Sequence, residues 1–170
     1  MRKIFSFYAV LGMLFLLSVA LNAYTDTAKN QYSFVTSAGQ AGLAEVAMAN
    51  MALAKSQSED VKQFARMMIA DHTKAGDELK TLAGQKKYVF PVSVTASQKT
   101  TADDLEKLSG TAFDKEYAKV AAADHEAAVK LFTKEAASGK DPEVKSWAET
   151  TLPTLKNHLQ AAQDLQAKVK

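Results

Sequence analysis

Apolar residues recur at intervals of three and four along much of the chain, and the clearest run lies within residues 58–82. The stripe consists of Val61, Phe64, Ala65, Met68, His72, Ala75, Leu79 and Leu82. This spacing places all eight side chains on one face of an α-helix. Because His72 is the only member with a polar side chain, we expect its ring to point into a helical core at mid-depth.

The same periodicity predicts three other long helices, over residues 31–55, 111–137 and 142–168, and a short helix over residues 97–108. The first long helix carries Glu45 on its apolar face, among small residues that we expect to let a neighbouring helix approach closely.

Capping signals mark where these helices begin. Ser56 with Glu59 forms a capping box before the second long helix, and residues 95–98 form another before the short helix. Asp141 and Pro142 suit the N-cap and the first position of the last helix. We expect the second helix to end near residue 82, followed by a terminating Gly84.

Residues 88–95 form the one β-like stretch, but Pro91 and the lack of a partner strand argue against a sheet. We expect an extended crossover that joins two helical hairpins. The predicted fold is therefore all-α, a ferritin-like four-helix bundle over residues 31–168 with a short extra helix.

The N-terminus resembles a targeting segment. Arg2 and Lys3 precede an uncharged apolar run over residues 4–21, and Ser18-Val19-Ala20 suits a cleavage site. We expect residues 1–23 to be a signal peptide and residues 24–30 a short tether, with an uncleaved membrane anchor as the alternative. The expected location is the periplasm or cell envelope, or the inner membrane if the anchor is retained. Any association with the envelope would be through this N-terminal segment.

Charge and composition exclude several function classes. Without residues 1–23, which contain two basic and no acidic residues, the formal net charge falls from +2 to 0. The remaining chain has no long basic run, so nucleic acid is not an expected partner. The chain has no cysteine, which excludes disulfides, zinc–thiolate sites, thiol chemistry and a lipidated cysteine after the leader.

Several separated motifs carry a resemblance to one family. They are Gly42-Leu43-Ala44-Glu45-Val46, the run over residues 61–75, His125-Glu126 with Leu131-Phe132, and Leu152-Pro153-Thr154-Leu155-Lys156-Asn157-His158-Leu159. On these motifs, residues 30–168 resemble a bacterial secreted domain of unknown function, DUF4142. The resemblance implies an exported ferritin-like bundle, often described as an outer-membrane protein, and it implies no established activity.

Four polar residues on four different predicted helices lie at similar distances from the hairpin turns: Glu45, His72, His125 and His158. At a rise of about 1.5 Å per residue, the partners within each hairpin differ in height by about one turn or less. We expect them to converge in one layer, where they could bind a single Zn, Fe, Mn or Cu ion. Asp71 and Asp124 each precede a histidine. Either could accept a hydrogen bond from a metal-binding histidine without binding the ion itself.

Other interpretations of these residues stay open. The four could be hydrogen-bonded to one another without metal, which would suit a structural or interaction module of the cell envelope. A metal-dependent oxidoreductase is a further alternative, although a non-enzyme is favoured. A di-iron centre is disfavoured because no Glu-x-x-His occurs, and a copper site on the methionines of residues 48–68 competes with simple core packing.

Overall fold

A computed structural model describes residues 33–169, which form five helices and no strand. The first helix occupies residues 33–55 of the described part. It is followed by α2 (Glu59–Lys86), α3 (Ala96–Glu106), α4 (Gly110–Ser138) and α5 (Pro142–Lys168). The predicted signal segment (residues 1–23) and tether (residues 24–30) lie outside the described residues.

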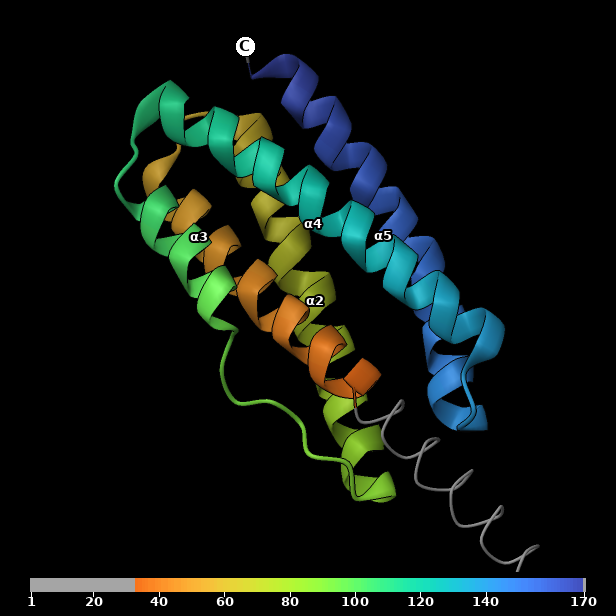
Figure 1. Ribbon diagram of the computed structural model, residues 1–170. Helices are drawn as coiled ribbons and strands as arrows, with labels where there is room; N and C mark the ends of the chain where they lie inside the picture. Colours follow the sequence, from red (N-terminus) through yellow and green to blue (C-terminus); the bar gives the residue numbers. More distant parts are fainter. Residues whose placement is uncertain (1–32, 170) are drawn as a thin grey trace, which may run out of the picture.

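The four long helices form two antiparallel hairpins, the first helix with α2 and α4 with α5 (Figure 1). Helices α4 and α5 pack against each other along their lengths, and α2 also contacts α5. The crossover and α3 join the hairpins, so the predicted four-helix bundle with a short extra helix is confirmed. No helix within residues 33–169 combines the length and apolarity needed to cross a membrane.

Both predicted ends of α2 require correction. Its N-cap is Ser58, whose side chain accepts a hydrogen bond from the backbone N–H of Val61, whereas Ser56 is buried and accepts from the N–H of Ser58. The predicted box of Ser56 with Glu59 was therefore two residues early. At the other end α2 continues past Gly84, and Lys87 adopts the left-handed conformation that a terminating glycine was expected to supply.

The other predicted helix starts are confirmed. Thr95 and Gln98 form a reciprocal capping box at α3, and the Asp141 side chain accepts hydrogen bonds from two backbone N–H groups at the start of α5. Helix α5 continues through Pro153. Lys55 donates hydrogen bonds to the carbonyls of Glu106 and Leu108, so the end of the first helix holds the end of α3.

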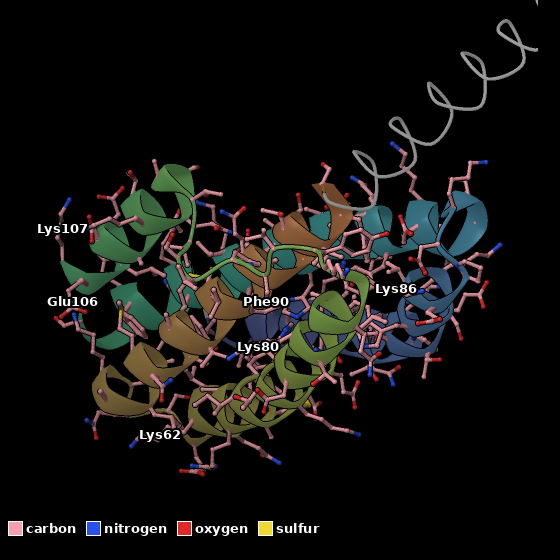
Figure 2. The ribbon with its side chains drawn as sticks, turned by 90° about the horizontal axis from the view of Figure 1, so that it is seen from below. Lys62, Lys80, Lys86, Phe90, Glu106 and Lys107 are labelled. Carbon is pink, nitrogen blue, oxygen red and sulfur yellow. The ribbon has the colours of Figure 1, made fainter. Side chains whose placement is uncertain are left out.

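The crossover between the two hairpins packs directly against the first helix. The Pro91 ring lies so close to Gly39 that a Cβ atom there would be 2.7 Å from Pro91 Cγ. Figure 2 shows the crossover passing along the bundle, with Phe90 on the same side as Lys80 of α2. The absence of a side chain at Gly39 therefore allows the crossover to pack against the first helix.

The buried side chains form two apolar clusters, one at each end of the bundle. The first includes Met48, Met68 and Tyr117, and the second includes Leu79 and Phe132. Along α2 and α4, the histidines at positions 72 and 125 fall between members of the two clusters. The core is thus interrupted by one polar layer.

Candidate metal centre

Three histidines from three helices meet in this polar layer. His72 lies on α2, His125 on α4 and His158 on α5, and the three ring centroids are 5.3–5.4 Å apart. Nε2 of His72 is 3.3 Å from Nε2 of His125. Each histidine contributes one ring nitrogen to a group of three nitrogens that all lie within 4.8 Å of one another. The predicted convergence of the histidines is therefore present.

Hydrogen bonds orient two of the rings and indicate which nitrogen carries the proton. Nδ1 of His125 lies 2.8 Å from the carbonyl oxygen of Ala121, which can only accept, so this nitrogen donates and Nε2 holds the lone pair. Nε2 of His158 lies 2.9 Å from a carboxylate oxygen of Asp71 and donates to it. The lone pair of His158 is then on Nδ1.

Nδ1 of His158 is buried and has no hydrogen-bond partner among the described residues. Leaving a buried acceptor unpaired costs about 1–3 kcal/mol. This unpaired nitrogen belongs to a ring whose centroid lies 5.3 Å from the centroids of His72 and His125, and a cation between the rings would satisfy it. The residues present thus fit a metal ion.

The environment keeps two of the rings uncharged. Burial, together with smaller contributions from the neighbouring His125 and His158, lowers the pKa of His72 to about 3. Burial also lowers the pKa of His125 to about 4, against the opposing effect of its bond to the Ala121 carbonyl. Both rings are therefore neutral at pH 7, which is the state in which imidazole binds metals.

Glu45 is buried beside this cluster but on the other side of His125. Its Oε1 lies 3.6 Å from Nδ1 of His125, the nitrogen that already donates to Ala121, and it is not part of the three-histidine group. Burial raises the pKa of Glu45 well above its ordinary value, and the charge of Asp124 raises it further. Both of its carboxylate oxygens are buried without a hydrogen-bond partner among the described residues, and its predicted role as a metal ligand stays a prediction.

The two predicted supporting aspartates differ in position. Asp71 is half-buried and reaches His158, the histidine of another helix, and not its own neighbour His72. Asp124 is exposed and lies with Glu45 and His125 around a small cavity of about 150 Å³. Only Asp71 therefore hydrogen-bonds to a histidine within the described part of the chain.

Tyr117 adjoins this site and was not singled out from the sequence. Its ring is buried, its hydroxyl has no partner in residues 33–169, and burial together with the charge of Glu45 raises its pKa. In the sequence it is one more aromatic residue on the inner face of a helix, so periodicity alone assigns it to the core.

A larger pocket of about 430 Å³ opens beside His72, between the first helix and α2. Small and apolar side chains dominate its wall, with polar groups at His72, Thr73, Asp77, Lys80 and Thr151. Its other lining residues are Ala38, Gly39, Ala41, Gly42, Leu43, Val46, Ala47, Ala75, Gly76, Leu79, Phe90, Ala128, Phe132, Trp147 and Leu155. The small residues near Glu45 thus border an open space.

The model of the domain of unknown function DUF4142 matches residues 18–165. The chain belongs to the DUF4142 family. No curated protein matches its sequence.

Two solved structures are similar to this DUF4142 chain. A DUF305 fragment from Deinococcus radiodurans superposes with a TM-score of 0.73 at 14% identity, covering 82% of this chain and 96% of that one. CopM in its Cu(II)-bound form superposes with a TM-score of 0.68 at 20% identity, covering 82% of this chain and 97% of that one. At these identities the likeness shows the helical fold alone.

Proposed function

We propose that this DUF4142 protein binds one transition-metal ion through Nε2 of His72, Nε2 of His125 and Nδ1 of His158. The observation that carries the proposal is the convergence of three ring nitrogens within 4.8 Å of one another. Three imidazoles from three helices bring the ion into the middle of the bundle, and the hydrogen bonds of two of them already present the correct nitrogen.

The spacing of the first pair supports a shared ion. Two nitrogens that each lie about 2.05 Å from a tetrahedral ion are about 3.3 Å apart. Nε2 of His72 and Nε2 of His125 have this separation, 3.3 Å. In the metal-free protein the same separation allows an N–H···N hydrogen bond between the two rings, which the ion would replace. Because the three ligand atoms lie within 4.8 Å of one another, small movements of the rings would bring all three to bonding distance of one ion.

Copper is the first metal to test among Zn, Fe, Mn and Cu. Imidazole nitrogen suits Cu, Zn and Fe, and Cu²⁺ stands highest in the general order of affinity. CopM, which shares this fold, has been solved in a Cu(II)-bound form. We assign the bound metal to storage, sensing or protection against metal stress. Its site would be outside the cytoplasm if the basic and apolar N-terminal segment acts as an export signal.

Elemental analysis of untagged protein, purified without chelators, tests the proposal. We expect about one equivalent of a single metal, or uptake of one equivalent of Cu²⁺ or Zn²⁺ on titration. The double variant His72→Ala with His158→Ala should lose that equivalent. The matched control is Asp124→Ala, which removes a metal-binding type of side chain that hydrogen-bonds to no histidine.

Two outcomes would contradict the proposal. Protein that takes up none of the four metals would favour the alternative, a structural envelope module whose histidines are held by Ala121 and Asp71. Unchanged metal content in the double variant would place the ion elsewhere. Circular dichroism of each variant checks that the helices are intact.

A further inference from the structure

With the proposed ion bound, one ring nitrogen among the three histidines still lacks a hydrogen-bond partner among the described residues. A metal-binding histidine ordinarily donates its second N–H to a carboxylate, a carbonyl or water. His125 has the carbonyl of Ala121 for this purpose and His158 has the carboxylate of Asp71. His72, bound to the ion through Nε2, would carry its proton on Nδ1, for which no described residue provides an acceptor.

Nδ1 of His72 faces the pocket between the first helix and α2. A Cβ atom on Gly42 would be 4.0 Å from this nitrogen, and both residues line the pocket. The missing acceptor can therefore come from a molecule in the pocket.

We propose that this pocket binds an apolar monocarboxylate, with its carboxylate accepting the Nδ1–H of His72 and its hydrocarbon chain against Leu79, Phe90 and Phe132. This inference rests on the proposed function, because an ion on Nε2 is what fixes the proton on Nδ1. It adds a second ligand class to the metal site and couples the two.

The size of the pocket suits a medium-length chain. At about 430 Å³ it falls within the range of small-molecule sites, about 300–1,000 Å³. Its wall follows the first helix from Ala38 to Ala47, which is about 14 Å at the rise of an α-helix. An extended fatty acid of medium length fits such a groove.

Charge favours a carboxylate over a neutral head group. Three imidazoles are neutral ligands, so a divalent ion bound by them keeps its positive charge beside the pocket. Lys80 adds a cation at the rim that forms no ion pair with a described residue, while Asp77 is the one acid on the wall. Figure 2 shows Lys80 near Phe90 on this side of the bundle.

Competition against a fluorescent dye tests the inference with the full-length protein. N-phenyl-1-naphthylamine, an uncharged apolar dye, is titrated into metal-loaded and metal-free protein and then displaced by decanoate or by decanol. Trp147 lines the pocket and is the only tryptophan, so energy transfer from it reports dye bound to the protein, and the glycine variants described next locate that dye. We expect decanoate to bind about tenfold more tightly to the metal-loaded form, since the ion fixes the donating proton on Nδ1 and hydrogen bonds to a charged acceptor are stronger than neutral ones. Decanol should show no metal dependence.

A pair of glycine variants controls for the site. A Cβ atom at Gly76 or at Gly84 of α2 would meet nothing within 4 Å, so a side chain can begin at either position without a clash at Cβ. Only Gly76 lines the pocket. Gly76→Leu should weaken binding of both the dye and decanoate at least about tenfold while leaving metal content unchanged. Gly84→Leu should behave as the wild type.

The outcomes separate the two claims. Bound metal together with equal decanoate affinity in the two forms overturns this inference and leaves the proposed function intact, with water as the acceptor for His72. Unaltered binding by Gly76→Leu also overturns it. A chain that binds no metal overturns the proposed function and, with it, the coupling to a carboxylate.

Discussion

At the scale of single residues, the site is defined by which nitrogen of each imidazole already has a partner. His125 and His158 each use one nitrogen in a hydrogen bond, to Ala121 and to Asp71. The remaining nitrogen of His125 lies 3.3 Å from Nε2 of His72, and one nitrogen of each of the three rings falls within 4.8 Å of the others. A purely structural histidine layer would be expected to pair its buried lone pairs, and Nδ1 of His158 is unpaired.

Removal of the Asp71 carboxylate should weaken metal binding without removing a ligand. Asp71→Ala leaves Nε2 of His158 without its acceptor, so the ring loses both its orientation and its fixed tautomer. We expect the metal Kd to rise about 10–100-fold, which a competition titration against a chromophoric chelator measures.

The matched variant is Asp124→Ala, because Asp124 also precedes a histidine on an exposed helix face but hydrogen-bonds to none within the described chain. Its Kd should change less than about twofold, within the range of ordinary surface substitutions. Equal effects of the two substitutions would mean that the Asp71–His158 contact does not support the metal site.

At the scale of helices, the caps decide where each histidine is placed. Asp141 begins the helix that carries His158, and its carboxylate also interacts with Tyr88 and Lys86 at the end of α2. One side chain therefore ties together the ends of the two helices that carry His72 and His158.

Asp141→Ala should lower the free energy of unfolding by about 1 kcal/mol at pH 7, the usual effect of losing an N-cap. Burial acts to raise the pKa of Asp141, but hydrogen bonds from Val144, Glu143, Tyr88 and Lys86 outweigh it and lower the pKa. The stabilisation is therefore present above about pH 4 and is lost as pH falls through the lowered pKa.

Urea unfolding between pH 7 and pH 2 measures this difference. The gap between wild type and Asp141→Ala should narrow at the acidic end. Asp164→Ala, an exposed aspartate within α5, serves as the control and should have little effect at either end. A gap that is constant with pH would contradict the assignment of Asp141 as an ionised cap.

Most of the helices could be predicted from the sequence, and the errors in their predicted ends have local causes. The stripe around His72 and the Asp141-Pro142 signal predicted α2 and α5, because apolar spacing and caps are properties of neighbouring residues. The end of α2 was placed too early because Gly84 was taken as its terminator, whereas Lys87 adopts the left-handed conformation. A non-glycine residue at such a position carries no sequence signal.

At the scale of the whole molecule, the crossover and the pocket share the first helix. Pro91 and Phe90 cover it at Gly39, and the pocket opens beyond, along Ala41 and Gly42. These contacts are between segments far apart in sequence, and the length of the crossover alone does not determine where it lies. At Glu45 itself α4 does approach the first helix, with Glu45 Oε1 3.6 Å from Nδ1 of His125, as the small residues around Glu45 predicted.

Substitutions at two helical glycines should therefore have opposite effects. Gly39→Ala places a methyl group 2.7 Å from Pro91 and should destabilise the protein by about 1–3 kcal/mol. Gly84→Ala meets nothing within 4 Å and should be stabilising by up to about 1 kcal/mol through helix propensity. Thermal unfolding of both variants measures this; stabilisation by Gly39→Ala would mean that the crossover does not dock on the first helix.

Convergence of the three histidines is the part of the site that sequence could predict, since helix rise and hairpin symmetry set their heights. Their tautomers and the position of Glu45 behind His125 depend on the direction of each side chain. Asp71 illustrates the limit, because it holds the histidine of another helix and not its own neighbour. To predict such a pairing, one must know how each helix is rotated about its own axis, and the spacing of residues in the sequence does not give this rotation.

The most direct test of the central claim is anomalous X-ray diffraction from crystals of the Cu²⁺-soaked protein, measured on both sides of the copper absorption edge. The account predicts one strong peak in the bundle core, about 2 Å from Nε2 of His72, Nε2 of His125 and Nδ1 of His158. A peak on the methionines near the first turn, on surface residues alone, or no peak in a crystal of folded protein would contradict it.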